Sequence, residues 1–151
     1  PFRVLAVSAA FGVAWLRGAD IAKEAQQPQR EPEWRVCRDS RELDAMRLDL
    51  FPDSSIASNT VSCFKVPNGL EANAVVKQMR DRYGILIGTG LDRFRHTTLR
   101  VGHMGITAGP LYVLPTLSAV ELALRDLGYK SEPGAGVAAA QFIFADATPG
   151  M

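Results

Sequence analysis

The chain has 151 residues, of which 47% are hydrophobic and 22% charged, so it is long enough for one ordinary domain with its own core and too short for two. Seventeen Lys and Arg against sixteen Asp and Glu leave a formal net charge of +1, so no basic field is available to bind nucleic acid through its phosphates. The composition therefore excludes a disordered chain and argues against a nucleic-acid-binding protein.

The first predicted element is the apolar run at residues 4–16. It is shorter than a bilayer span requires, and Ser8 and Gly12 interrupt it. We interpret it as part of a buried helix over residues 7–25, not as a signal peptide, and expect no membrane association. The polar, proline-bearing stretch at residues 26–34 ends this helix and has the composition of a linker.

Regular elements follow the linker. Helical spacing predicts a helix over residues 39–48, and the alternating, β-rich stretch at 58–67 predicts a strand that the turn Pro67-Asn68-Gly69 closes. The next segment, residues 70–84, has its apolar residues on one helical face and Gly84 placed to end the helix.

The second half of the chain repeats the alternation of strand and helix. We predict strands at residues 85–90 and 98–104 around the polar loop 91–96. A long helix is expected from Pro110 to Gly128, kinked at Pro115, and a shorter amphipathic helix over 136–146. These elements predict an α+β fold, with a small, mainly antiparallel sheet covered by helices on one face.

Two cysteines, Cys37 and Cys63, lack metal-ligand spacing and belong to no secretory disulfide framework. We therefore expect a reducing, cytoplasmic compartment, two thiols that serve packing only, and no metal site.

Arg100 is the residue that suggests chemistry. On a strand, Leu99, Val101 and His103 point to one face, and Arg100, Gly102 and Met104 to the other. If the helices cover the first face, Arg100 points outward, beside a glycine that lets a ligand approach. Its planar guanidinium suits bidentate capture of a carboxylate. The alternative is a solvated or salt-bridged arginine on an exposed sheet face.

The stretch at residues 82–129, with LRVGHMG at its centre, resembles the C-terminal small domain of class V aminotransferases, which are pyridoxal-phosphate enzymes of fold type I. The family pattern is Arg-[IV]-Gly-x-x-Gly on a strand before a long helix, and the resemblance extends over about residues 48–146. It implies that Arg100 binds the α-carboxylate of the amino-acid or 2-oxo-acid substrate. Gly102 and Gly105 would then add no side chains beside Arg100, and His103 would be a core residue.

The resemblance also implies what this stretch does not supply. Family members are longer, and a preceding large domain carries the Schiff-base lysine and binds pyridoxal 5'-phosphate. We therefore assign residues 48–151 to the small domain and residues 1–47 to a poorly matching helical or linker segment. We assign no catalytic or cofactor-binding residue, and expect the chain alone to be inactive. The family further implies a homodimer. Because the chain begins with Pro1 and not with Met, it is either processed or a piece of a longer protein.

Two other readings stay open. The end of the chain also resembles pyridoxamine–pyruvate aminotransferase, which is the alternative within the family. From another class, the chain could be a stand-alone binding or regulatory module without catalysis, which holds a carboxylate metabolite through Arg100 or only associates with itself. Arg93 and Arg95, on the loop before the Arg100 strand, are candidate second contacts to an acidic substrate or else solvated loop charges.

Overall fold

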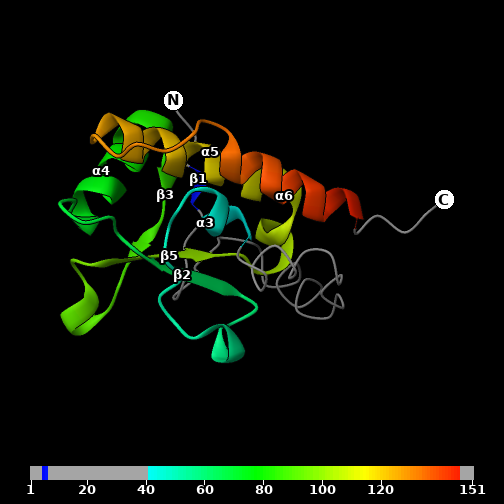
Figure 1. Ribbon diagram of the computed structural model, residues 1–151, viewed down its shortest axis with the longest axis horizontal. Coiled ribbons are helices and arrows are strands. Elements are labelled where there is room, and N and C mark those ends of the chain that lie inside the picture. Colours follow the sequence, from blue (N-terminus) through cyan, green and yellow to red (C-terminus); the bar gives the residue numbers. More distant parts are fainter. Residues whose placement is uncertain (1–4, 7–40, 147–151) are drawn as a thin grey trace, which may run out of the picture.

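The computed structural model describes residues 5–6 and 41–146 (Figure 1). Its helices and strands, in chain order, are β1 Leu5–Ala6, α3 Arg41–Ala45, β2 Val61–Lys65, α4 Ala72–Tyr83, β3 Ile85–Leu86, β4 Gly88–Thr89, β5 Thr98–Gly102, α5 Pro110–Asp126 and α6 Ala135–Asp146. Three 3-10 turns join them: η1 Ser54–Ile56, η2 Asp92–Phe94 and η3 Gly105–Ala108.

The sheet that carries Arg100 has three antiparallel strands in the order β2-β5-β4, so β5 is central. Helices α4, α5 and α6 all lie on one side of this sheet, above it in Figure 1, and the loops that contain η1 and η2 lie below. The predicted α+β class and the mainly antiparallel sheet are therefore confirmed. A separate parallel pair, β1 with β3, was not predicted.

The core lies between the sheet and these helices. Phe64 and Leu99 are cross-strand partners, and both are almost fully buried. They meet the apolar faces of α4 and α5, whose buried residues follow helical spacing. The largest fully buried side chains are Phe64, Met46, Met79, Leu99, Leu124, Val75 and Val120.

Helix α4 ends where the sequence predicts. Gly84 adopts the left-handed conformation with φ 69°, and its N–H bonds the carbonyls of Arg80 and Met79. The α4 surface is tied to α5 by Asp126, whose Oδ2 accepts hydrogen bonds from the Tyr83 hydroxyl at 2.6 Å and the Gln78 amide at 2.9 Å. These contacts fix two of the helices that cover the sheet.

The predicted helix at residues 39–48 is wrong in its length. Helix α3 ends at Ala45, because Arg47 takes a positive φ of 57°, which a continuing helix does not allow. The Tyr129 hydroxyl donates to the Arg47 carbonyl at 2.8 Å. A contact from the far end of the chain therefore stabilises this turn, and no local pattern contained it.

The predicted strand at residues 85–90 is two strands. Ile85–Leu86 pair with β1 in parallel, whereas Gly88–Thr89 pair with β5 in antiparallel, so the segment changes its partner at the buried Ile87. The apolar run 4–16 is also wrong as a uniform helix, because Leu5–Ala6 form strand β1. Here strand pairing with a distant segment overrides local apolar character.

Both C-terminal segments are helical, and the kink expected at Pro115 stays a prediction. Helix α5 continues through Pro115, and the hydroxyl of the next residue, Thr116, donates to the Tyr112 carbonyl at 2.7 Å. Helix α6 begins after Gly134 and buries Gly136, Ala140 and Ile143 along one stripe.

Other predictions lie outside the described residues: the body of the helix at 7–25, the linker at 26–34 and the packing role of Cys37. In the described part of the chain, no helix is long and apolar enough to cross a membrane. The same residues include no group of three or more His, Cys, Asp or Glu side chains that could bind a metal ion.

Candidate functional site

Arg100 lies at the middle of the central strand, on the face opposite helices α4, α5 and α6. Its cross-strand partners are Cys63 on β2 and Gly88 on β4. Leu99, one residue earlier, is fully buried, whereas Arg100 is half-buried. The predicted alternation along this strand therefore holds, and the guanidinium points away from the helical core.

One hydrogen bond orients the guanidinium. Arg100 Nε donates to the backbone carbonyl of Thr89 at 2.8 Å. Among the described residues, Nη1 and Nη2 make no hydrogen bond, and no carboxylate lies within ion-pair distance of Arg100. The described part of the chain thus leaves the end of a fixed cation without a counter-ion, which is the arrangement that a carboxylate ligand requires.

The η2 loop folds over the same face of the sheet. Thr98, two residues before Arg100, is buried, and its hydroxyl donates to the Phe94 carbonyl at 3.1 Å. Phe94 packs edge to face on Phe51 with ring centroids 4.7 Å apart. Gly90 completes this contact, because a Cβ there would overlap the Thr98 hydroxyl and the Phe94 carbonyl. This packing shields one side of Arg100's strand from water.

Cys63 is half-buried beside Arg100, and burial raises the pKa of its thiol, although a hydrogen bond from Thr98 and the Arg100 charge oppose the rise. A neutral thiol is a poor nucleophile. Cys63 is therefore a packing residue on this face, as its sequence context predicts.

The glycines after Arg100 have different settings. Gly102 is buried at the end of β5, where it pairs with Val61. Gly105 is exposed with φ 55°, and nothing lies within 4 Å of where its Cβ would be. Backbone conformation, and not close approach, therefore requires the glycine at 105.

His103 belongs to the opposite face. It is 6% exposed, its Nε2 lies 2.9 Å from the Ser62 hydroxyl, and burial lowers its pKa to about 4. It borders a cavity of about 30 Å³, between the sheet and the helices, that Glu42 and Thr116 also line. His103 is a core residue in this structure, remote from the face that Arg100 occupies.

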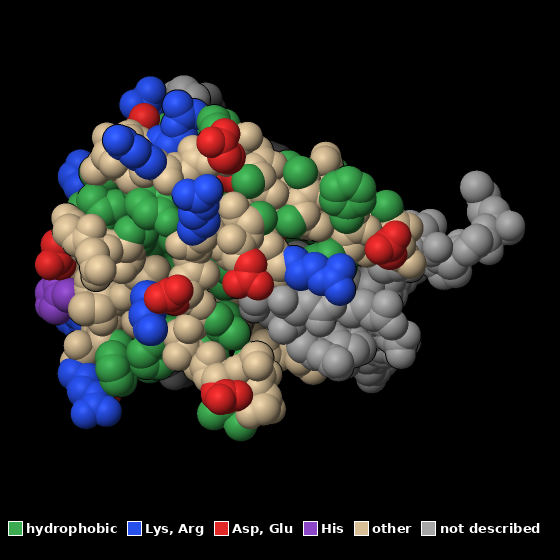
Figure 2. Space-filling model, in the orientation of Figure 1, with side chains coloured by type: hydrophobic (Ala, Val, Ile, Leu, Met, Phe, Trp, Pro, Cys, Tyr) green, Lys and Arg blue, Asp and Glu red, His purple; other side chains and the backbone are tan. Residues whose placement is uncertain are grey.

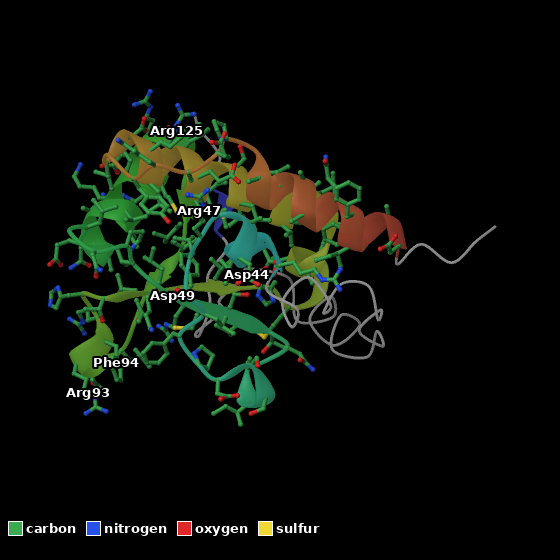
Figure 3. All side chains as sticks on the ribbon, in the orientation of Figure 1. Asp44, Arg47, Asp49, Arg93, Phe94 and Arg125 are labelled. Atoms are coloured by element: carbon green, nitrogen blue, oxygen red, sulfur yellow. The ribbon has the colours of Figure 1, made fainter. Side chains whose placement is uncertain are left out.

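The structure does not bring Arg93 and Arg95 to the guanidinium of Arg100. Both are exposed on the η2 loop. Arg93 stacks on its own neighbour, with its Cζ 4.8 Å from the centroid of the Phe94 ring, and it points away from the sheet in Figure 3. Their role as second contacts stays a prediction.

The lysines in the described residues do not fit a Schiff-base site. Lys65 and Lys77 are more than half exposed and lie near Asp49 and Asp81, and Lys130 is exposed after α5. A lysine that forms an imine needs a desolvated setting or a neighbouring cation. None of the three has one, so these residues do not hold pyridoxal 5'-phosphate by the covalent link its enzymes use. Lys23 lies outside the described residues.

The structure adds two groups that sequence reasoning missed. Gly88 lies opposite Arg100, and the Thr89 carbonyl binds its Nε. Gly88 lies in the strand predicted from the sequence at residues 85–90, but its register against Arg100 depends on how the 91–96 loop turns. The pairing of β4 with β5, and not the local sequence, supplies that information.

Comparison with known proteins gives a consistent set of relatives. The chain is 35% identical over 106 residues to a protein named soluble hydrogenase, small subunit, of Synechococcus, and 35% identical over 99 residues to L-aspartate–glyoxylate aminotransferase of Paracoccus denitrificans. These alignments cover 70% and 66% of this chain but only 27% and 23% of the relatives. The chain thus spans about a quarter of the length of the curated relatives it matches. No protein-family model matches it.

Solved structures are similar over a larger part of the chain. Ureidoglycine–glyoxylate aminotransferase of Bacillus subtilis superposes with a TM-score of 0.74 at 25% identity, covering 85% of this chain and 34% of that one. Pyridoxamine–pyruvate aminotransferase of Mesorhizobium loti gives a TM-score of 0.72 at 29% identity, covering 85% and 32%. The fold described above is therefore one that occurs within aminotransferases several times as long.

Proposed function

We propose that this chain is the C-terminal part of a class V aminotransferase, because its neighbours in sequence and structure are class V aminotransferases of fold type I that it matches over about two thirds of its own length. The complete enzyme moves an amino group between an amino acid and a 2-oxo acid such as glyoxylate or pyruvate. Residues 48–151 are its small domain, and their part in the reaction is to bind the substrate carboxylate.

Arg100 carries this proposal. Its side chain is half-buried on the sheet face opposite the described helices, is oriented by the Thr89 carbonyl, and has no carboxylate partner among the described residues. A charge-assisted pair with a carboxylate is among the stronger polar contacts, about 1.5–3 kcal/mol for each hydrogen bond to a charged group. Gly102, at the end of the same strand, is proposed as the second substrate-binding position because it adds no side chain.

Pyridoxal 5'-phosphate is the cofactor of the proposed enzyme, and it supplies the electron sink for the transfer of the amino group. The lysines of the described residues do not fit it, so we route no step through this chain. A large domain outside residues 48–151 supplies the cofactor site in this proposal.

Exposed apolar side chains favour the proposal that this chain is one part of an enzyme over the proposal that it is a stand-alone module. Met104, Ile106 and Leu111 follow the Arg100 strand and are 47%, 57% and 83% exposed. Apolar side chains gathered near a site are commonly covered by another part of a protein. The stand-alone carboxylate-binding module stays the alternative from another class, and it predicts that the chain needs no partner to remain monodisperse.

Pyridoxamine–pyruvate aminotransferase is the second candidate, favoured by the 29% identity and TM-score of 0.72 to the Mesorhizobium loti structure. A carboxylate clamp at Arg100 serves both reactions, since both use a 2-oxo acid. A homodimer and a cytoplasmic location belong to the same proposal and rest on the resemblance alone.

The first experiment is a titration of the 15N-arginine-labelled chain with sodium pyruvate, followed by side-chain NMR. We expect a saturable shift of the Arg100 signal, and at least about tenfold weaker binding in Arg100→Ala, since one charged hydrogen bond contributes about 1.5 kcal/mol or more. Arg125→Ala is the matched control, because Arg125 is exposed on α5, at the far side of the helices from the sheet (Figure 3). Equal affinity of the wild type and Arg100→Ala would refute the assignment.

A further inference from the structure

We propose that Gly88 is the positioning residue for Arg100. Because it has no side chain, the guanidinium bends across β4, donates Nε–H to the Thr89 carbonyl, and presents Nη1 and Nη2 together to an incoming carboxylate. This inference rests on the proposed function for the identity of the ligand. The orientation of the guanidinium itself can be measured with no ligand present.

The guanidinium lies beside the position of a Cβ at residue 88, so a side chain larger than a methyl group there would compete with it for space. Gly88 and Arg100 are direct partners in the antiparallel ladder, so their side-chain positions share one face. A Cβ built on Gly88 would lie 3.7 Å from Arg100 Nη2 and 3.9 Å from Nε. A methyl group at position 88 would thus touch the cation, and a larger side chain would enter its space.

The two flanks of Arg100 are unequal. On β2 its partner is Cys63, which has a half-buried side chain, and on β4 its partner is Gly88, which has none. The Arg100 side chain bends to the open flank, and its Nε donates a hydrogen bond to the Thr89 carbonyl oxygen at 2.8 Å. The choice of residue at 88 therefore decides the direction in which the guanidinium points.

This direction selects one way of binding a carboxylate. A guanidinium can pair with a carboxylate side-on, through Nε and one Nη, or end-on, through Nη1 and Nη2. The hydrogen bond to Thr89 occupies Nε, so the side-on mode is lost and the end-on mode remains. Position 88 is thus a determinant of how the substrate carboxylate approaches this face.

A graded set of variants tests the inference. A methyl group at 3.7 Å makes ordinary van der Waals contact, so Gly88→Ala should keep the Nε–H bond, whereas the branched side chain of Gly88→Val enters the guanidinium space. We expect the exchange of the Arg100 Nε–H with water to accelerate at least about tenfold in Gly88→Val, and its affinity for pyruvate to fall by a similar factor. Cys63→Ala, on the other flank, is the control and should keep the slow Nε–H signal.

The outcomes separate this inference from the proposed function. A Gly88→Val variant with unchanged Nε–H exchange would overturn the positioning role. So would a wild-type Arg100 Nε–H that exchanges as fast as that of the exposed Arg125, a measurement that needs no variant to fold. Slow exchange in the wild type together with no shift on addition of pyruvate would instead refute the carboxylate clamp and leave the effect of Gly88 standing. Valine suits a strand, so global unfolding is not expected to mimic the result.

Discussion

The two ionisable side chains of the LRVGHMG stretch face opposite environments, and each is stabilised in a different charge state. Arg100 lies on the face opposite the described helices, where the Thr89 carbonyl accepts a hydrogen bond from its Nε. His103, three residues later on the buried face, bonds Ser62 and has its pKa lowered to about 4 by burial. Strand alternation predicted this division, because it depends only on which residues are odd or even.

His103 should make stability depend on pH. An unfolded histidine titrates near pH 6.5, so between about pH 6.5 and 4 the unfolded chain binds more protons than the folded one. The free energy of unfolding should therefore fall as the pH falls through this window, by up to about 3 kcal/mol in total. Urea denaturation at a series of pH values measures the slope.

His96→Gln is the matched control for this prediction. His96 is the second of the two histidines, is exposed, and lies 3.4 Å from Glu71. The steep dependence between pH 6.5 and 4 should persist in His96→Gln and be reduced in His103→Gln. Equal slopes in the two variants would show that His103 is not the group responsible.

What the sequence could not supply at the residue scale is the pairing partner of Arg100. Its outward direction was predictable. The absence of an ion pair with the described residues argues against the salt-bridged alternative, whereas carboxylate binding at Arg100 stays a prediction. Gly88 and the Thr89 carbonyl came only from the register of β4 against β5. Register depends on loop geometry, which the composition of the 91–96 loop does not reveal.

At the scale of elements, a buried carboxylate fastens the start of α6 to α5. Glu121 is 3% exposed, and its two oxygens accept the N–H groups of Gly134 at 2.8 Å and Gly136 at 2.6 Å. These N–H groups lie at the helix N-terminus, where backbone donors lack internal partners and negative charge is favoured. The contact explains why α6 begins where it does.

Glu121→Gln should lower the free energy of unfolding by about 1–3 kcal/mol. The amide nitrogen cannot accept a hydrogen bond, so one of the two N–H groups loses its partner in a buried setting. Urea denaturation measures the loss, and amide hydrogen exchange at Gly136 should accelerate with it. Glu132→Gln, exposed two residues before Gly134, is the control and should change stability by less than about 0.5 kcal/mol. Equal losses in both variants would contradict the role of Glu121.

The elements that the sequence predicted well are those whose own residues determine them. Helix α4 has an apolar face and a terminal glycine, and α5 has Pro110 at its start, so both occur with bounds close to the prediction. Helix α3 is shorter than predicted because Tyr129, far along the chain, binds the turn at Arg47. Local patterns carry no information about such a partner.

At the scale of the whole molecule, the described residues form a sheet with a helical layer on one side and the half-buried Arg100 on the other. Figure 2 shows positive and negative side chains interspersed over the visible face, with no large field of one sign. The relatives are several times as long as this chain. The fold class and the direction of Arg100 were predictable, whereas the substrate pocket depends on residues that this chain does not contribute in our proposal.

The purified chain should therefore be catalytically silent. Incubated with pyridoxal 5'-phosphate, alanine and glyoxylate, it should form no more pyruvate than a reaction without protein, because the lysines of the described residues are exposed. Borohydride reduction followed by mass spectrometry should find no preferred adduct at Lys65, Lys77 or Lys130. Turnover above the protein-free rate would contradict the assignment of the chain to the small domain alone.

The change of strand partner at Ile87 implies an order of events in folding. Strand β4 pairs with β5 across a short loop, whereas β3, two residues earlier, pairs with β1 near the start of the chain. Closing a long loop costs more conformational entropy than closing a short one, and contacts distant in sequence form later on average. The β4·β5 hairpin, which pairs Gly88 with Arg100, can therefore form before the N-terminal strand β1 pairs with β3. The orientation of the Arg100 side chain thus does not depend on the contact that forms last.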